Sequence, residues 1–251
     1  MRKHLGLALL TFVAGLHSAS AQTAVHTAPH WEYAGKSGPS HWSELASDFS
    51  SCKVGKNQSP IDIHASKAAP LNPIDFHYTS SAGEIVNNGH TVQVNLEGAG
   101  SIHLPSGDYK LVQFHFHTPS EESFNGKHYP LVAHLVHKSE SGELAVVAVL
   151  FKQGKENAAL KQVFAGLPAA AGDKHALAAD LDVTAALPAK HAYYAYMGSL
   201  TTPPCSEGVH WQVMKQASEV SREQLSAFRK LYAMNARPGQ ALNGRSIDFG
   251  G

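Results

Sequence analysis

Short apolar runs separated by glycine, proline and asparagine fill residues 85–151, and they restrict the possible folds more than any other feature of the sequence. Within residues 91–96 every second residue is apolar, which is the pattern of a strand with one buried face. Residues 144–151 are continuously apolar, as expected of a central strand that is covered on both faces. A further strand is expected over residues 191–200, before a pair of prolines. This part of the chain is therefore predicted to be mostly β structure.

Helical signals are few. Ser221 and Gln224 form a capping box, and the apolar residues that follow as far as Tyr232 have helical spacing. Residues 157–167 place their apolar side chains on one helical face and predict a second helix. Strands outnumber helices and do not alternate with them. We therefore expect a mainly β (α+β) single domain, built on one large, mostly antiparallel sheet with a few peripheral helices.

The N-terminal segment has the composition of a cleavable secretory signal. A basic start precedes an apolar run over residues 5–16, and Ala-Ser-Ala follows at residues 19–21. The run is too short to span a bilayer, which needs about 20 apolar residues. We expect residues 1–21 to be removed and residues 22–251 to form the mature domain, periplasmic or secreted and without a membrane anchor.

Two cysteines, Cys52 and Cys205, are present in the expected mature domain. In an oxidising compartment they predict one disulfide bond, and the alternative is a pair of free thiols. A loop of this length closed by the bond contributes on the order of 5 kcal/mol in the chain-entropy model.

The charge balance disfavours polyanionic partners. Lys and Arg together number 20, as do Asp and Glu, so the formal net charge is +0. There is thus no electrostatic reason to expect nucleic acid or an anionic membrane as a partner. A small neutral substrate fits this balance better.

Three of the 17 histidines have a spacing that favours a metal site. In the run VQFHFH, over residues 112–117, strand geometry places Gln113, His115 and His117 on one face. A third imidazole comes from His134 on the next predicted strand. If the two strands are neighbours, three nitrogens can bind one ion and leave the fourth tetrahedral position for water. A His-x-His pair alone is more often a solvated strand face, so the prediction depends on this convergence.

Recurring motifs stand in order along the chain: HWEY (30–33), GPSHW (38–42), QSPIDI (58–63), NNGH (87–90), QFHFH (113–117), AHLVH (133–137), LTTPP (200–204) and NARP (235–238). Together they resemble the α-class carbonic anhydrases of the bacterial secreted or periplasmic type, from about Trp31 to Ile247. The resemblance implies a large twisted antiparallel sheet with the metal at the bottom of a cone-shaped cleft. It also implies a Zn²⁺ cofactor on His115, His117 and His134.

The implied activity is that of a carbonate dehydratase, a lyase that reversibly hydrates carbon dioxide to bicarbonate and a proton by attack of zinc-bound hydroxide. Thr201 resembles the family's gatekeeper threonine, whose hydroxyl donates to Glu121. Because a carboxylate only accepts, this contact sets the direction of the hydrogen bonds at the site. His90 resembles the proton shuttle, an exposed imidazole with a pKa of about 6.5 that passes protons to buffer.

Other positions resemble residues that line or support the family's site. Gln113 resembles the acceptor for His115, and Asn235 resembles a support for the glutamate and histidine network. The resemblance further implies a polar wall that orders water, formed by Tyr33, Asn88 and Gln93. It also implies a pocket for carbon dioxide and bicarbonate, formed by Thr202, Val136, Val146, Leu200 and Trp211.

The chain departs from the family pattern at one support of the third histidine. Val132 stands where a glutamate normally accepts a hydrogen bond from that ligand, while Glu122 stands where a histidine is frequent. We hypothesise that Glu122 takes over the acceptor role. The competing hypothesis is that Val132 simply weakens the metal site.

Three alternatives to this interpretation are considered. His115, His117 and Glu121 also satisfy the H-x-H-x3-E spacing of cupins, but the second cupin motif is not found at His134 or beyond it. A non-catalytic carbonic-anhydrase-like binding domain would usually lack a zinc ligand, and none is lost here. Esterase activity would be a side reaction of the same site.

We expect a monomer or a homodimer.

Overall fold

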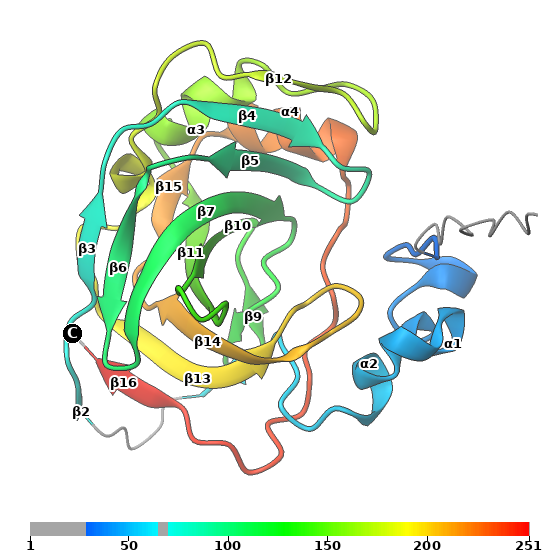
Figure 1. Cartoon of the computed structure of the whole chain (residues 1–251). Helices are drawn as coiled ribbons and strands as arrows, with labels where there is room; N and C mark the ends of the chain where they lie inside the picture. Colours follow the sequence, from blue (N-terminus) through cyan, green and yellow to red (C-terminus); the bar gives the residue numbers. More distant parts are fainter. Residues whose placement is uncertain (1–28, 65–69, 251) are drawn as a thin grey trace, which may run out of the picture.

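A twisted and curved sheet of thirteen strands organises the described part of the chain, residues 29–64 and 70–250, in this computed structural model (Figure 1). The expected signal peptide lies outside the described residues. Ten strands follow one another across the sheet in the order β12 (Lys174–Ala176), β4 (Gly83–Asn87), β5 (Val92–Leu96), β7 (Gly107–His117), β10 (Leu131–Lys138), β11 (Leu144–Gln153), β14 (Glu207–Met214), β13 (Tyr193–Ser199), β16 (Asp248–Gly250) and β2 (Pro70–Leu71).

Further strands extend the architecture. β3 (Asp75–Tyr78) pairs with β6 (Gly100–Leu104), β6 pairs with β7, and β15 (Ser218–Val220) pairs with β11. A separate small sheet contains β1 (Asp62–Ile63), β8 (Ser123–Phe124) and β9 (Lys127–His128). Most pairs in the large sheet are antiparallel, as predicted, but β11 runs parallel to both β14 and β15, and β16 runs parallel to β2.

The helices are short and peripheral. Figure 1 shows α3 and α4 beside β4 and β12 at one end of the sheet, and α1 and α2 together at another side. The α-helices are α1 (Trp42–Leu45), α2 (Ser51–Val54), α3 (Ala158–Phe164) and α4 (Arg222–Leu231), and the 3₁₀ turns are η1 (Gly35–Ser37), η2 (Ser47–Phe49) and η3 (Val183–Ala186). Among the described residues, no helix combines the length and the apolar character needed to cross a membrane.

Both predicted helices are present, with one difference in extent. Ser221 and Gln224 form the reciprocal capping box that starts α4. In α3, Asn157 is the cap that accepts the Leu160 N–H, and the helix ends at Phe164 instead of continuing to residue 167. Glycine at 166 and proline at 168 explain the earlier end, since neither continues a helix well.

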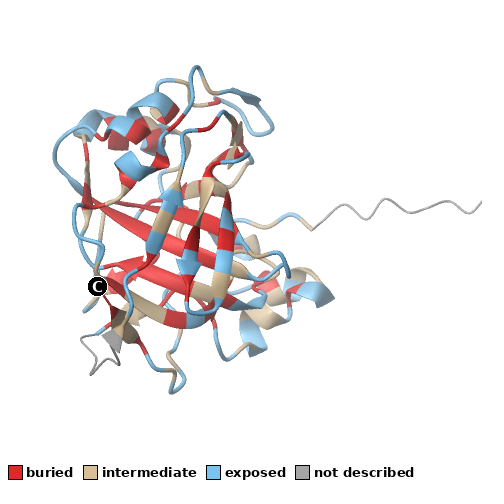
Figure 2. Cartoon of the chain, turned by 60° about the vertical axis from the view of Figure 1, so that its left-hand side comes forward, coloured by how far each residue is buried: buried red, intermediate tan, exposed pale blue. Residues whose placement is uncertain are grey.

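The large sheet separates two hydrophobic layers. Phe114 and Phe116 of β7 contribute to the larger layer, while Val136 and Val146 of the neighbouring strands contribute to the smaller one on the other face. Figure 2 shows buried residues continuing along the middle strands. The continuous apolar run of β11 is buried on both faces, as predicted. The alternation in β7 therefore places Phe114 and Phe116 in the core and His115 and His117 on the opposite face.

The predicted disulfide bond is present. Cys52 and Cys205 are joined with their Cα atoms 5.0 Å apart, across a sequence separation of 153 residues. Arg237 reinforces the same region, since its guanidinium donates to the backbone carbonyls of Cys52 and Ser59. The bond and these contacts attach the α2 segment to the loop that contains Thr201.

His137 of β10 is a buried histidine outside the predicted metal cluster. Its Nδ1 lies 3.3 Å from the Ala145 carbonyl oxygen, which only accepts, so the proton is on Nδ1. Its Nε2 therefore accepts from the Tyr78 hydroxyl at 2.8 Å. Burial lowers the pKa of His137 to about 4. At a pH between about 4 and about 6.5, the ring is therefore neutral in the folded protein and protonated in the unfolded chain.

We expect this ring to destabilise the fold as the pH falls. Between an unfolded pKa of about 6.5 and the folded value of about 4, only the unfolded state takes up the proton, so stability falls with decreasing pH by at most about 1.4 kcal/mol per unit. Urea unfolding of the wild type and of His137→Gln, from pH 7.5 to 4, measures the difference in slope. Identical slopes for the two proteins would contradict the assignment.

Candidate metal centre

Three histidine side chains converge on the face of the sheet opposite the larger core. His115 and His117 come from β7 and His134 from β10, where the antiparallel register pairs His134 directly with His115. One potential ligand atom from each ring lies within 4.8 Å of the others. His117 and His134 are each 1% exposed, so water does not compete freely for these rings. The convergence predicted from the sequence is therefore present.

The outer nitrogen of each ring donates to a group that only accepts. His115 Nδ1 lies 2.9 Å from Gln113 Oε1, and His117 Nδ1 lies 2.7 Å from the Asn235 carbonyl oxygen. His134 Nε2 lies 3.0 Å from Glu122 Oε1. These contacts place the protons on the outer nitrogens. Three lone pairs then face inward, on Nε2 of His115, Nε2 of His117 and Nδ1 of His134.

The inward nitrogens fit a divalent cation such as Zn²⁺. His117 Nε2 is buried and has no hydrogen-bond partner among the described residues, which is costly for a nitrogen that binds nothing. Burial lowers the pKa of His115 to about 3 and that of His117 well below its usual value, so both rings are neutral ligands at physiological pH. Neutral nitrogen donors in a three-fold arrangement are a common protein set for catalytic zinc.

Glu122 occupies the place that the hypothesis requires. Its carboxylate is 0% exposed and contacts His134 Nε2 through both oxygens, at 3.0 and 3.2 Å. Burial opposes the cationic form of His134, but the charge and hydrogen bond of Glu122 outweigh it and raise the pKa of His134. Val132 is buried and pairs with His117 across the strands, and a valine side chain has no acceptor to offer.

Glu121 lies beside the cluster but is not one of its three convergent ligands. Its Oε1 accepts the backbone N–H of Arg237 at 2.7 Å. Burial is the main cause that raises the pKa of Glu121 to about 7, while the Thr201 side chain is among the groups that lower it. Glu121 Oε2 is buried without a hydrogen-bond partner among the described residues, so the bond from Thr201 that the resemblance implies stays a prediction.

Asn235 connects the cluster to its surroundings. Besides accepting from His117, it accepts the Thr118 N–H on Oδ1 and donates through Nδ2 to the carbonyls of Phe116 and His90. The residue is 0% exposed. It therefore holds the end of β7 and the His90 loop in fixed relation.

A pocket of about 260 Å³ opens above the histidines, with a polar and an apolar wall. It brings together all the residues predicted to form the two walls, namely Tyr33, Asn88, Gln93, Val136, Val146, Leu200, Thr202 and Trp211. His90, Gln113 and Thr201, which were assigned other roles, line it as well. Trp31, Thr91 and Leu144 also line it and were not predicted. Trp31 lies in the HWEY motif two residues before Tyr33, and that proximity is the signal that could have identified it.

The expectation that His90 is exposed is wrong. Its ring stacks on Trp31 with 3.7 Å between centroids and an angle of 8°, and its Nδ1 is buried without a partner among the described residues. Burial lowers the pKa of His90, against the raising effect of Glu32. The indole covers one face of the imidazole, which explains why a turn histidine is only partly accessible.

The family model for eukaryotic-type carbonic anhydrases matches residues 37–249. A carbonic anhydrase from Pectobacterium carotovorum is 41% identical over 248 residues, covering 98% of this chain and 99% of the relative. One from Klebsiella pneumoniae is 42% identical over 237 residues, covering 93% of this chain and 96% of the relative. The solved α-carbonic anhydrase of Thermovibrio ammonificans, in complex with sulfanilamide, superposes with a TM-score of 0.86 at 48% identity and covers 88% of this chain and 100% of its own. The chain therefore belongs to the α-class, or eukaryotic-type, carbonic anhydrase family, the carbonate dehydratases of the lyase class.

Proposed function

We propose that the chain binds Zn²⁺ through His115, His117 and His134 and reversibly hydrates carbon dioxide to bicarbonate and a proton. The observation that carries the proposal is the set of three inward lone pairs, each oriented by an acceptor on the far side of its ring. Bound Zn²⁺ acidifies water to near neutrality when its ligands are uncharged imidazoles, an effect for which carbonic anhydrase is the standard example.

Thr201 and Glu121 orient the nucleophile. In this proposal the Glu121 carboxylate accepts the Thr201 hydroxyl proton, and the threonine oxygen then offers only lone pairs to the pocket. An attacking oxygen must then donate its own proton to Thr201 and direct a lone pair at the substrate. This arrangement lowers the entropy cost of attack, since the oxygen is aligned before carbon dioxide arrives.

The apolar wall suits a substrate without charge or hydrogen-bond donors. Val136, Val146, Leu200 and Trp211 line one side of the pocket, and the Trp211 and His134 rings are 4.9 Å apart. Carbon dioxide can therefore rest against hydrocarbon close to the histidines, where water gains no hydrogen bonds. Thr202 lies at the same pocket and can contact the more polar bicarbonate product.

The opposite wall serves proton removal. His90 is assigned the role of proton acceptor, with Tyr33, Asn88 and Gln93 holding the intervening water in place. Stacking on Trp31 fixes the ring at the edge of the pocket.

Replacing His90 by Ala is expected to slow turnover at low buffer concentration. The loss should stay below the roughly 100-fold typical of a general base in contact with substrate, because water and buffer also accept the proton. Stopped-flow hydration with increasing imidazole should restore the rate. The matched control is His103→Ala, which removes an exposed imidazole of β6. Equal sensitivity of both variants to buffer would contradict the shuttle role.

The direct experiment is metal analysis and a hydration assay of the purified protein, before and after chelation and zinc reloading. Activity that follows zinc content supports the enzyme. Full zinc occupancy without hydration would support the non-catalytic alternative. The cupin alternative is wrong, since the family match covers residues 37–249. Hydrolysis of an activated ester in the same samples tests the side reaction.

We also propose that the mature domain acts in the periplasm or outside the cell. The disulfide bond supports an oxidising compartment, and the first 21 residues have the composition of a signal peptide. N-terminal sequencing of the protein from cell fractions is expected to give Gln22 as the first residue.

A further inference from the structure

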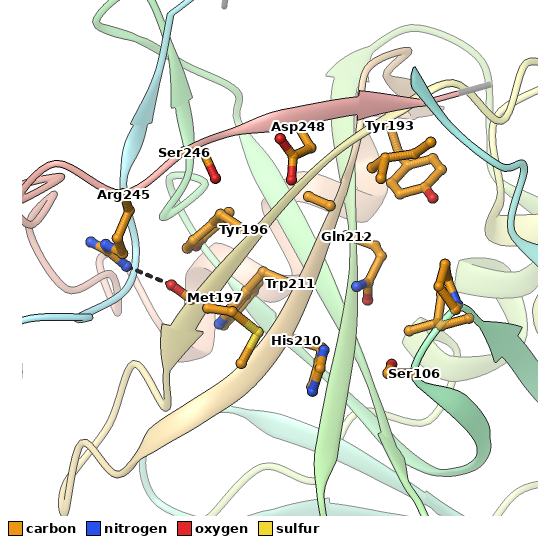
Figure 3. Close-up of a pocket in the computed structure, with 14 residues that line it drawn as sticks. Ser106, Tyr193, Tyr196, Met197, His210, Trp211, Gln212, Arg245, Ser246 and Asp248 are labelled. Atoms are coloured by element: carbon orange, nitrogen blue, oxygen red, sulfur yellow. Dashed lines mark hydrogen bonds between the residues drawn. The ribbon is translucent and has the colours of Figure 1, made fainter. Parts of the chain in front are cut away.

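A second hollow, of about 400 Å³, lies where β13, β14 and β16 pass the turn between β6 and β7 (Figure 3). Neighbouring residues of a strand point to opposite faces, so His210 and Gln212 of β14 face away from the metal pocket that Trp211 lines. Its apolar walls include Leu71, Leu104 and Tyr193. None of the groups assigned to catalysis reaches this hollow except through the shared Trp211.

The floor of the hollow is a row of three residues on adjacent strands. Ala195 of β13 pairs with Asp248 of β16 on one side and with Gln212 of β14 on the other, so the three side chains share a face. With strands about 4.8 Å apart, the backbones of Asp248 and Gln212 are about 10 Å from each other. The small Ala195 side chain leaves the space between them open. Figure 3 shows Asp248 and Gln212 on either side of this position, with the Gln212 side chain extending away from Asp248.

Both polar ends of the row present acceptors without partners. Gln212 is 5% exposed, and its Oε1 has no hydrogen bond among the described residues. No hydrogen bond or ion pair joins the Asp248 side chain to any other part of the chain that the structure describes. The Gln212 oxygen is a buried acceptor with no donor, which destabilises a fold unless something binds it. Asp248 is half-buried and adds a carboxylate at the other end of the row.

The cation that borders the hollow is largely engaged by the protein itself. Arg245 directs its guanidinium to four backbone carbonyls, those of Leu242, Met197, Gln58 and Ala241, at 2.8 to 2.9 Å. Four of its five N–H groups are therefore already used within the protein. The hollow thus offers unpaired acceptors, one of them a carboxylate, beside an apolar wall.

We propose that this hollow binds a small primary ammonium compound that carries one apolar ring. The ammonium group lies over Ala195 and donates to Asp248 and to Gln212 Oε1, and the ring packs against Leu104 and Tyr193. A volume of about 400 Å³ is ample for a one-ring molecule. An anion is disfavoured, because it would meet the Asp248 carboxylate beside the Gln212 oxygen.

Calorimetry with 2-phenylethylamine tests this proposal, with 2-phenylethanol and 3-phenylpropionate as probes of the same shape. The amine is expected to bind saturably, the alcohol more weakly and the carboxylate least. Tryptophan fluorescence should change with the amine, since Trp211 is the one of the three tryptophans that lines the hollow. Binding of the carboxylate as tight as that of the amine would overturn the proposal.

Two variants locate the site. Asp248→Asn and Gln212→Leu should each weaken binding of the amine by about 10-fold or more, since the first removes the charge opposite the ammonium group and the second removes an acceptor. Glu97→Gln removes the same charge from an exposed position elsewhere and should leave binding unchanged. Measurements on zinc-free protein should match those on the loaded enzyme, which separates this site from the metal pocket. Insensitivity to both variants, or loss of binding with the metal, would refute it.

Discussion

His134→Ala is expected to abolish carbon dioxide hydration and to leave the purified protein largely free of zinc. The ring supplies one of three convergent nitrogens, and two ligands on one strand hold the ion far less firmly than three on two strands. Acidification of water by the metal is worth several kcal/mol, so the rate should fall by more than about 1000-fold. No other cluster of this type is found in the described part of the chain, so a replacement ligand is not expected.

The measurement is zinc content per chain together with stopped-flow hydration at pH 7.5 to 9. His77→Ala is the matched control, because it removes an exposed imidazole of β3. Thermal unfolding distinguishes lost metal from a lost fold: the variant should unfold at the temperature of chelated wild type. A variant that keeps one zinc per chain and wild-type turnover would refute the assignment of His134.

The alternation of side chains explains why the ligand positions could be predicted from the sequence. Period-2 spacing requires His115 and His117 to share a face, whatever the rest of the fold does. Convergence with His134 also requires β7 and β10 to be neighbours, and the observed register meets this condition. Local patterns of this kind also predicted the cap of α4, where Ser221 and Gln224 are three residues apart.

Features that depend on distant segments could not be predicted in this way. The parallel pairing of β11 with β14 joins residues more than 60 positions apart, and no local pattern encodes it. The stacking of Trp31 on His90 likewise joins residues that are far apart in the sequence. His90, at the end of the NNGH motif, does lie at the pocket. Its exposure was predicted wrongly because the covering residue, Trp31, is distant in sequence.

The hollow over Ala195 also depends on distant segments and could not be predicted from local sequence patterns. Asp248 and Gln212 are remote in sequence and become neighbours of one alanine only through two strand pairings. Alternation alone marks Gln212 as a polar residue in a mostly apolar strand. It does not say whether the amide meets a partner, and in the structure its oxygen has none among the described residues.

Glu122→Gln is expected to weaken zinc binding and turnover by about 10- to 100-fold, the usual cost of losing an acceptor behind a ligand. The amide can still accept from His134, but it lacks the charge that makes the imidazole a stronger donor to the metal. Two carboxylates already lie within 4 Å of this ring, Glu122 at 3.0 Å and Glu121 at 3.9 Å. Zinc affinity by competition with a chromophoric chelator, together with the pH profile of hydration, measures the change.

Val132→Glu separates the two hypotheses for the departure from the family pattern. If Glu122 has taken over the acceptor role, a second buried carboxylate beside it adds like-charge repulsion and should impair the wild-type protein. In the Glu122→Gln background the same substitution should recover zinc affinity, because the new carboxylate becomes the only one behind His134. If Glu122 has taken over the role, Val132→Glu thus lowers zinc affinity in the wild-type protein and raises it in the Glu122→Gln background. If Val132 simply weakens the site, Val132→Glu raises zinc affinity in both backgrounds. The cycle of two single variants and the double variant measures this difference. Improvement by Val132→Glu alone would instead show that the natural valine costs the site an acceptor that Glu122 does not replace.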